Sequence, residues 1–255
     1  MNIFKRVFGH LYFGIGILLF VLTMLPVLIP ASIALLFKEP QRAKIIHPTF
    51  KIWMSIFLPL VGCPVIRKGK NNFKKGENYV VVVNHNSFVD IPVSMPWIPG
   101  PNKTLAKIEM TKIPLFGIIY RAGSILVNRA DEHSRKESFT EMNATLNLGL
   151  HLCLYPEGTR NKSEEVLQPF YDGAFITAIR NQKPIIPAIL MGTKKILPLQ
   201  PKFWAWPSTI QYHFLPAIET KGLRLSDRQE LNSKVHGVMK DYLLRQQKPT
   251  SAQTA

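Results

Sequence analysis

Cysteine is scarce in this sequence, and so are acidic side chains. The 255 residues include two cysteines, Cys63 and Cys153, and neither belongs to a Cys-x-x-Cys pair or to a close cluster with histidine. A disulfide framework and a zinc site are therefore not expected, and reduced thiols fit a cytosolic chemistry. The length is enough for one sizeable domain with a small appendage, and the sequence contains no internal repeat or low-complexity segment.

The shortage of acidic residues leaves a strongly basic chain. Lysine and arginine together number 32, against 16 for aspartate and glutamate, and the formal net charge is +16. Such a charge indicates an anionic partner, which can be nucleic acid, an acidic small molecule or a membrane surface. The sequence contains no recognisable nucleic-acid recognition module, so nucleic acid is not expected to be the partner.

Charged residues are absent from the 27 positions 11–37. This run is long enough to cross a bilayer, which takes about 20 apolar residues. Pro26 and Pro30 interrupt its second half, whereas a secretory signal has a shorter apolar centre followed by a cleavage site. Two interpretations remain open: a tilted transmembrane span, or a helix that stays in one leaflet beside a second amphipathic helix over 49–60. The length disfavours a buried core helix. Basic residues on both flanks favour anchoring at an anionic lipid surface, so we expect residues 1–62 to form a membrane-associated motif of two helices.

Short β-branched runs alternate with helical patterns in the rest of the chain. The alternation predicts an α/β fold with a mostly parallel central sheet flanked by helices, with sites at the strand ends. We expect one domain over residues 63–247, entered through a polar linker at 67–78, and a disordered tail at 248–255. Strands are predicted at 79–83, 103–106, 124–127, 152–155, 185–190 and 209–214. Helices are predicted at 88–95, 114–122, 135–148, 173–181 and 227–246, the last with a capping box formed by Ser226 and Gln229.

The sequence "NHNSFVD" (84–90) follows the apolar run at 79–83. His85 and Asp90 are five positions apart, so their side chains diverge on one helix and lie on opposite faces of one strand. They can meet only across a bend between the strand and a following helix. If they meet, the imidazole is a candidate general base and the carboxylate is the acid that orients it.

Four more blocks follow in order: "LAKIEMTKIPLFG" (105–117), "GSILVNR" (123–129), "YPEGTR" (155–160) and "KPIIPAIL" (183–190). Each is weak alone. In this order and spacing, over about residues 79–190, they resemble the glycerolipid acyltransferase family, the PlsC-like 1-acyl-sn-glycerol-3-phosphate acyltransferases. The hydrophobic N-terminus is similar to the membrane-associated helical motif of that family.

The resemblance implies transfer of a fatty acyl group from acyl carrier protein or coenzyme A to the sn-2 hydroxyl of lysophosphatidate, giving phosphatidate. It implies that His85 takes the proton of the attacking hydroxyl, that Asp90 orients the imidazole, and that no cofactor or metal takes part. No protein nucleophile is required. Ser87 is expected to cap the following helix, and Cys153 is expected to lie in the core.

The phosphate of the lysolipid needs fixed positive charge, which arginine supplies as a bidentate fork and lysine as a point charge. Arg129 matches residues that contact phosphate in the family. Lys107 and Arg160 are the next candidates. The simpler interpretation of each is a solvated surface residue, which is the fate of most of the lysines and arginines here.

The "YPEGTR" block contributes three further candidate substrate contacts. Glu157 can orient Arg160, accept a hydrogen bond from a substrate hydroxyl, or brace the turn. Gly158 lets the backbone approach a ligand closely, and Thr159 is the third candidate in the block. Two positions depart from the family pattern. Asp172 stands where many relatives have a basic residue, which weakens the phosphate clamp locally, and Asn128 replaces a frequent aspartate.

Other functions remain open at this stage. The same chemistry can act on another lysolipid, such as a lyso-aminolipid, or the protein can be a non-catalytic membrane lipid-binding protein. A metal-dependent hydrolase lacks a third ligand beside His85 and Asp90 at suitable spacing. The expected partners are a lysophospholipid, an anionic membrane surface and the thioester donor. The expected location is the cytoplasmic face of a bacterial inner membrane.

Overall fold

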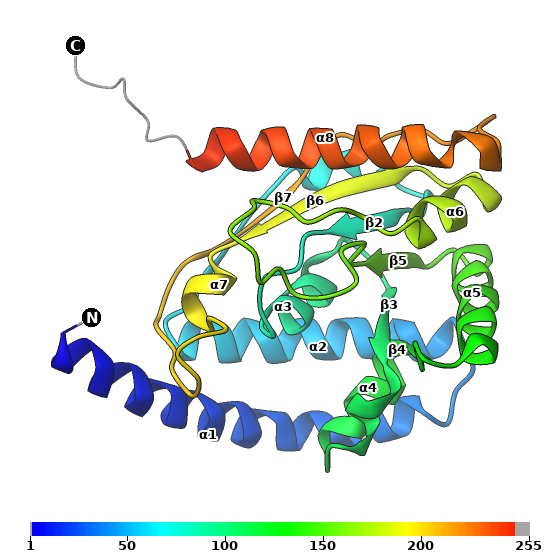
Figure 1. Cartoon of the computed structure of the whole chain (residues 1–255). Coiled ribbons are helices and arrows are strands. Elements are labelled where there is room, and N and C mark those ends of the chain that lie inside the picture. Colours follow the sequence, from blue (N-terminus) through cyan, green and yellow to red (C-terminus); the bar gives the residue numbers. More distant parts are fainter. Residues whose placement is uncertain (1, 248–255) are drawn as a thin grey trace.

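A seven-stranded sheet lies at the centre of the computed structural model, which describes residues 2–247 (Figure 1). The predicted tail, 248–255, lies outside the described residues. The strands are β1 (Val65–Lys68), β2 (Val80–Val83), β3 (Asn102–Lys107), β4 (Ser124–Val127), β5 (His151–Leu154), β6 (Ile185–Met191) and β7 (Ile210–Phe214). The helices are α1 (Ile3–Ala34), α2 (Gln41–Leu60), α3 (Asp90–Trp97), α4 (Phe116–Gly123), α5 (Glu132–Asn147), α6 (Gly173–Arg180), α7 (Thr193–Ile196) and α8 (Arg228–Gln247).

The strand order is β1-β7-β6-β2-β5-β3-β4, and β6 and β7 form the antiparallel pair of this sheet within residues 2–247. All other neighbouring strands are parallel. The carboxyl ends of β6, β2, β5, β3 and β4 therefore meet at one edge. The predicted α/β fold with a mostly parallel sheet is confirmed, and its central strand β2 is buried along its whole length, as parallel strands covered on both faces are.

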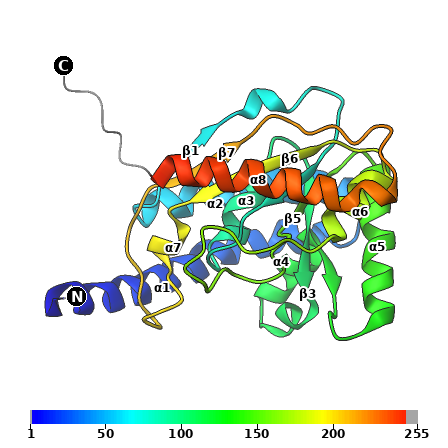
Figure 2. The ribbon, with the colours of Figure 1, turned by 45° about the horizontal axis from the view of Figure 1, so that its top comes forward.

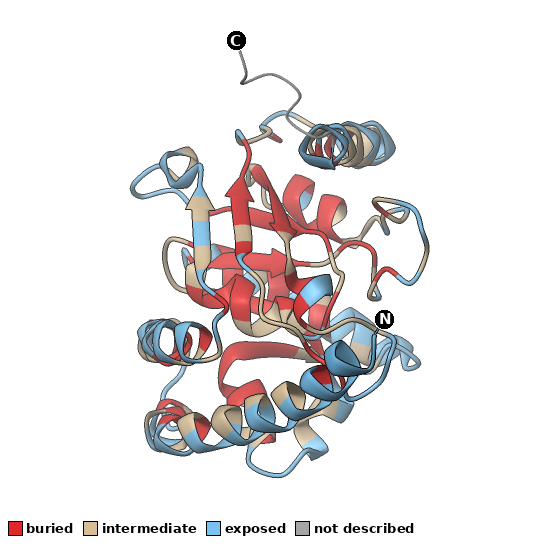
Figure 3. Cartoon of the chain, turned by 90° about the vertical axis from the view of Figure 1, so that its left-hand side faces the viewer, coloured by how far each residue is buried: buried red, intermediate tan, exposed pale blue. Residues whose placement is uncertain are grey.

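Helices cover both faces of the sheet, and alternate residues of β2 point to each face. Val81 and Val83 pack with residues of α1, α2 and α3. Val80 and Val82 pack with residues of α5, α6 and α8. Figures 1 and 2 show α8 on one side of the sheet and α1 with α2 on the other. In Figure 3 the strands are mostly buried, whereas the outer sides of the long helices are exposed.

Helix α1 is long, apolar and only partly covered. Its most apolar 18-residue window has a mean hydropathy of 2.5, and 22% of that window is buried, so by length and composition it could cross a membrane. The Asn2 side chain caps its start by accepting from the Lys5 N–H at 2.9 Å. Helix α2 packs beside α1 and begins at Gln41, eight residues before the predicted helix at 49–60. The first half was missed because basic residues on its exposed side hide the buried stripe that starts at Ala43.

Two local predictions were wrong, and one short helix was missed. Part of the predicted linker, 67–78, belongs to β1, a short edge strand whose residues are alternately half-buried and exposed and so leave little hydrophobic signal. Ser226 and Gln229 do not form the capping box, because the Asp227 carboxylate accepts from the Arg224 N–H at 2.7 Å instead. The short helix α7 was not expected, since four residues carry no periodicity.

Candidate active site

The predicted site residues follow the carboxyl ends of parallel strands. His85 lies two residues after β2, Lys107 ends β3, and Arg129 lies two residues after β4. The block 155–160 follows β5 directly. Because these four strands run in the same direction, the sheet brings segments that are far apart in the sequence to one edge, where ligand sites of open α/β sheets form.

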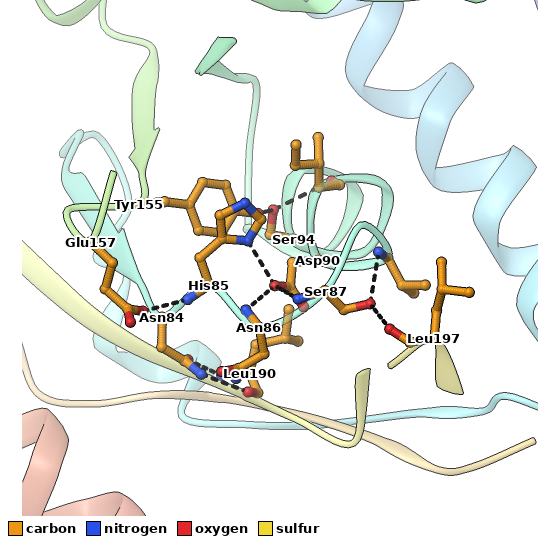
Figure 4. A network of polar contacts seen from close by, with 12 residues as sticks. Asn84, His85, Asn86, Ser87, Asp90, Ser94, Tyr155, Glu157, Leu190 and Leu197 are labelled. Atoms are coloured by element: carbon orange, nitrogen blue, oxygen red, sulfur yellow. Dashed lines mark hydrogen bonds and ion pairs between the residues drawn. The ribbon is translucent and has the colours of Figure 1, made fainter. Parts of the chain in front are cut away.

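His85 and Asp90 meet across the predicted bend (Figure 4). His85 Nδ1 lies 2.8 Å from Asp90 Oδ2, which also accepts from the N–H groups of Asn86 at 2.5 Å and Ser87 at 2.7 Å. A carboxylate oxygen that already accepts from two backbone N–H groups can only accept from the imidazole as well. Nδ1 therefore carries the hydrogen of this contact, and Nε2 is the ring nitrogen that faces away from Asp90. Asp90 is fully buried, whereas the His85 side chain is 13% exposed. Within residues 2–247 Nε2 makes no hydrogen bond, so this nitrogen can take a proton from a ligand.

Side chains from other elements hold the bend that carries this pair. Asn84 donates to the Leu190 carbonyl at 2.9 Å and accepts from the Leu190 N–H at 2.7 Å, which ties the end of β2 to β6. The Ser87 hydroxyl accepts from the Val89 N–H at 3.3 Å and donates to the Leu197 carbonyl at 2.8 Å. The expected capping of the following helix by Ser87 was wrong, because Val89 is the N-cap of α3 and no side chain caps it. The position of the imidazole is therefore set by the sheet and not by the bend alone.

Glu157 braces the backbone on which His85 sits. Its carboxylate accepts from the His85 N–H at 2.7 Å and from the Gln168 N–H at 3.1 Å, and the residue is 2% exposed. Burial raises the pKa of Glu157, and the two backbone N–H groups oppose that shift. Both oxygens are thus occupied by backbone donors. This geometry favours the bracing interpretation over a direct contact with Arg160 or a substrate.

Tyr155 is a part of the site that the sequence did not assign. Its ring packs against the imidazole of His85, with centroids 4.4 Å apart and planes inclined at 33°. Its hydroxyl lies 2.6 Å from the Ser94 hydroxyl of α3, which fixes the ring. The signal for this role is its position, because an aromatic residue that directly follows β5 shares the sheet edge with the end of β2.

The three candidate phosphate contacts lie in different surroundings. The Arg160 guanidinium lies 3.5 Å from the centroid of the Phe88 ring, beside the block that carries His85. Partial burial lowers its pKa, and the Asp90 carboxylate acts in the opposite direction. Lys107 instead forms an exposed ion pair with Glu109 at 3.2 Å. Arg129 donates to the Gly158 carbonyl.

The remaining block residues line a cavity. Gly158 has φ 68°, a conformation that favours glycine, and a Cβ added there would lie 2.7 Å from the ring of the exposed Tyr171, which would have to move. Thr159 is exposed and lines the same cavity. Asp172 faces α8, where its carboxylate accepts from Asn232 Nδ2 at 2.9 Å, so it does not occupy the cavity.

An apolar cavity of about 240 Å³ adjoins the other side of the site. Phe88 and Val89, which follow His85 closely, contribute to its wall together with residues of α1, α2, α4 and α7. It therefore runs from the His85 segment toward the long apolar helices.

Comparisons with known proteins show which family the chain belongs to. The profile of the family described as Acyltransferase matches residues 65–191, which contain every candidate site residue. The chain belongs to this acyltransferase family. It is 33% identical over 177 residues to the 1-acyl-sn-glycerol-3-phosphate acyltransferase of Cocos nucifera, a match that covers 67% of this chain and 55% of that protein. It is 32% identical over 173 residues to the beta enzyme of Homo sapiens, covering 65% of this chain and 59% of the relative.

A solved acyltransferase has a similar fold. The crystal structure of the 1-acyl-sn-glycerophosphate acyltransferase PlsC from Thermotoga maritima superposes with a TM-score of 0.78, at 21% identity, and the alignment covers 99% of this chain and 100% of that one. The similarity therefore includes the N-terminal helices α1 and α2. The chain spans little more than half the length of the Cocos nucifera and Homo sapiens relatives.

Proposed function

We propose that this protein transfers a fatty acyl group from an acyl carrier protein or coenzyme A thioester to the sn-2 hydroxyl of 1-acyl-glycerol-3-phosphate, which gives phosphatidate. The observation that carries this proposal is the His85–Asp90 pair at the strand edge, in which Nδ1 is held at 2.8 Å by a buried carboxylate. An alcohol attacks a thioester slowly at neutral pH unless a base removes its proton. His85 is the base that the geometry supplies.

The reaction proceeds in two proton transfers with one bond made and one broken. His85 Nε2 takes the hydroxyl proton while the lysolipid oxygen forms a bond to the thioester carbonyl carbon. The resulting tetrahedral intermediate collapses, the carbon–sulfur bond breaks, and the leaving thiolate takes the proton back from Nε2. The products are the ester and a free thiol, and His85 returns to its neutral form. Throughout, the Asp90 carboxylate stabilises the imidazolium that exists between the two transfers.

The surroundings of the nearby nucleophiles support direct transfer without an acyl-enzyme. Ser87 is fully buried, and its hydroxyl donates to the Leu197 carbonyl instead of to His85. Cys153 is also fully buried, and burial raises the pKa of its thiol to about 12, so it stays protonated at neutral pH. Neither side chain is placed to attack a substrate. The reaction then needs no cofactor beyond the thioester, as is general in the family.

Arg160 is our proposed contact for the phosphate of the acceptor. In 1-acyl-glycerol-3-phosphate the phosphate is attached to the carbon next to the one that bears the reacting hydroxyl, so its cation has to lie near His85. Arg160 lies over the ring of Phe88, three residues after His85. Lys107, which has an exposed carboxylate partner, is a second candidate at the end of β3. Thr159 and the Gly158 backbone are further proposed contacts. Arg129, which donates to the Gly158 carbonyl, is also proposed to contact the phosphate of the acceptor.

The apolar cavity of about 240 Å³ is our proposed site for the transferred chain. Its lining includes Gly16 and Phe20 of α1, Phe57 of α2 and Phe116 of α4. A fatty chain there is withdrawn from water, and its thioester end emerges at Phe88, next to His85. Burial of apolar surface supplies about 25 cal/mol per Å² toward binding such a chain.

Residues 1–62 are proposed to hold the domain, residues 63–247, on one leaflet of an anionic membrane. The solvent-facing side of α1 is apolar, with Leu11 63% and Leu18 58% exposed. Its first half is tied to a loop near the C-terminal part of the chain, because the Ala205 N–H donates to the Gly9 carbonyl at 3.1 Å. A helix fastened along the domain in this way favours lying in the interface over spanning the bilayer. We propose the cytoplasmic face of a bacterial inner membrane as the location.

A panel of lysolipids tests the acceptor. Purified protein in mixed vesicles receives a labelled acyl thioester together with lysophosphatidate, a lyso-aminolipid or glycerol-3-phosphate, and the labelled products are separated. We expect phosphatidate from lysophosphatidate and little product from the other acceptors. Another lipid product without phosphatidate would move the proposal to that acceptor. No transfer to any acceptor, with the same result for His85→Ala, would favour a non-catalytic lipid-binding protein.

A further inference from the structure

Most of the block "LAKIEMTKIPLFG" (105–117) has no part in the proposed reaction. After β3 it forms the short 3₁₀ helix η2 (Ile108–Lys112) and a turn that leads into α4. Residues 108–116 are called the 108–116 segment below. The segment packs on α1, because the Phe116 ring meets the Phe20 ring edge to face with centroids 5.8 Å apart. In Figure 1, α4 lies beside α1, on the side of the molecule away from α8.

The 108–116 segment presents apolar side chains to its surroundings. Ile113 is 44% exposed and Leu115 is 45% exposed. The segment meets α1 at Phe20, in the stretch of that helix where Ile17 and Leu18 are also exposed. Exposed apolar surface that extends over neighbouring elements marks a contact with a membrane or with another protein.

The backbone holds this apolar turn in a fixed shape. The Gly117 N–H donates to the Ile113 carbonyl at 2.8 Å, and a Cβ on Gly117 would overlap the Thr111 carbonyl. Leu115 has φ 62°, a conformation that leucine rarely adopts. Such a conformation costs free energy and is typical of residues that contact a ligand or a partner. The turn therefore keeps Leu115 exposed at a cost, which favours an apolar partner for its side chain.

The apolar cavity reaches the surface next to the 108–116 segment. Met110 and Phe116 line its wall together with Ile17 of α1 and Phe88 of the bend that carries His85. Ile17 and Phe88 are also exposed, so the rim of the cavity includes both α1 and the bend. A fatty chain that passes between a bilayer and this cavity would cross the rim beside the segment.

The charges around the segment favour an anionic lipid surface as the partner. Lys107 lies directly before η2 and Lys112 ends it, and both are exposed. Lys107 pairs with Glu109, whereas Lys112 forms no ion pair within residues 2–247. Basic side chains beside exposed apolar ones are typical of segments that lie in the interface of an anionic leaflet.

We propose that the 108–116 segment is a second membrane contact, which places Ile113 and Leu115 among the lipid chains of the leaflet on which α1 lies. The inference rests on the proposed function, which supplies both the leaflet and the fatty chain. The contact brings the rim of the apolar cavity to the lipid chains, so that a chain can move between bilayer and cavity without crossing water. It adds to residues 1–62 a membrane contact that belongs to the catalytic domain itself.

Binding to vesicles tests this contact without turnover. The double variant Ile113→Gln, Leu115→Asn removes the apolar side chains, and asparagine tolerates φ 62°. The matched control is Leu148→Asn, Leu225→Gln, which changes leucines that are 44% and 41% exposed next to α5 and α8. On vesicles of phosphatidylethanolamine and phosphatidylglycerol we expect the double variant to bind roughly tenfold more weakly than the wild type, from the loss of buried apolar area. The control should bind like the wild type.

A fluorescent probe reports insertion directly. Cys63 and Cys153 are both buried, so a cysteine introduced by Ile113→Cys can be labelled selectively with a polarity-sensitive dye. Leu148→Cys is the control. On the same vesicles we expect the dye at position 113 to shift to shorter wavelength and to be quenched by brominated lipid chains. The dye at position 148 should show neither effect.

Two results would overturn the proposal. One is wild-type vesicle binding by the folded Ile113→Gln, Leu115→Asn variant, and the other is an unshifted dye at position 113 on vesicle-bound protein. If sedimentation shows that this variant loses self-association while its vesicle binding is unchanged, the surface belongs to a second copy of the chain. These measurements need no acyl transfer, so they can support the contact even where the proposed reaction fails.

Discussion

Replacing Asp90 with asparagine removes one charge from the proposed catalytic pair and keeps the shape of the side chain. The Asp90 oxygen that faces His85 also accepts from two backbone N–H groups, so in the variant the amide oxygen is expected to take that position. His85 then keeps its tautomer but loses its counter-ion. Leaving one member of a buried ion pair unpaired costs about 3–5 kcal/mol. The His85 side chain is 13% exposed, so water screens part of this cost and the low end of the range applies.

A cost of about 3–4 kcal/mol in the transition state corresponds to a fall of about 10²–10³-fold in kcat. The assay follows transfer of a labelled acyl group at saturating donor and lysophosphatidate. KM for both substrates should change little, because the lost interaction is with an imidazolium that exists only during the reaction. Thermal unfolding of the variant checks that the bend around residues 84–90 is intact.

The matched control is Asp227→Asn. The Asp227 carboxylate lies directly before α8 and accepts from the Arg224 N–H at 2.7 Å. We expect this variant to lose at most a local cap and to keep kcat. The reasoning would be refuted by a folded Asp90→Asn variant whose kcat lies within about threefold of the wild type, since the carboxylate would then not stabilise a charge on His85. An equal loss in Asp227→Asn would point to a general effect of removing acidic groups.

Three further predictions concern stability and membrane binding. Burial lowers the pKa of His151 to about 4, so protonation of this side chain disfavours the folded state. The free energy of unfolding should fall by up to about 3 kcal/mol as the pH drops from 6.5 to 4. Unfolding of His151→Asn measured over the same pH range should lack this decrease. Gly158→Ala should cost about 1–2 kcal/mol in urea unfolding because of φ 68°, and adding Tyr171→Ala should remove only the steric part of the loss. The double variant Leu18→Glu, Leu22→Glu should be released from anionic vesicles in flotation assays. Unchanged binding would show that this side of α1 does not contact the membrane surface.

The strands of the sheet centre could be predicted from the sequence because their burial makes them apolar without interruption. Residues 80–83 are four valines, and β6 is similarly apolar. The edge strand β1 could not be predicted in this way, because one side of it faces water and it has only four residues. The first half of α2 was missed for a related reason: hydropathy averages its buried and basic sides, whereas the buried residues Ala43, Ile46 and Phe50 recur at helical spacing.

The site divides along the same line between local and distant contacts. His85 and Asp90 lie five residues apart, so their meeting could be deduced from one bend. The contact of Glu157 with His85 joins residues 72 apart in the sequence. Its donor is a backbone N–H, which every residue except proline has, so the sequence does not indicate this partner. The Ser94–Tyr155 contact spans 61 positions.

The position of the dyad at a strand end explains how residues next to His85 can line cavities on both faces of the sheet. Side chains within a strand alternate between the two faces, so the apolar cavity and the cavity lined by Gly158 and Thr159 are separated by the sheet along most of its width. They can approach each other only where the strands stop, at the edge that carries His85 and Tyr155. In the proposed function the fatty chain in the apolar cavity ends at that edge, so the fold itself would bring the reacting end of the chain to His85.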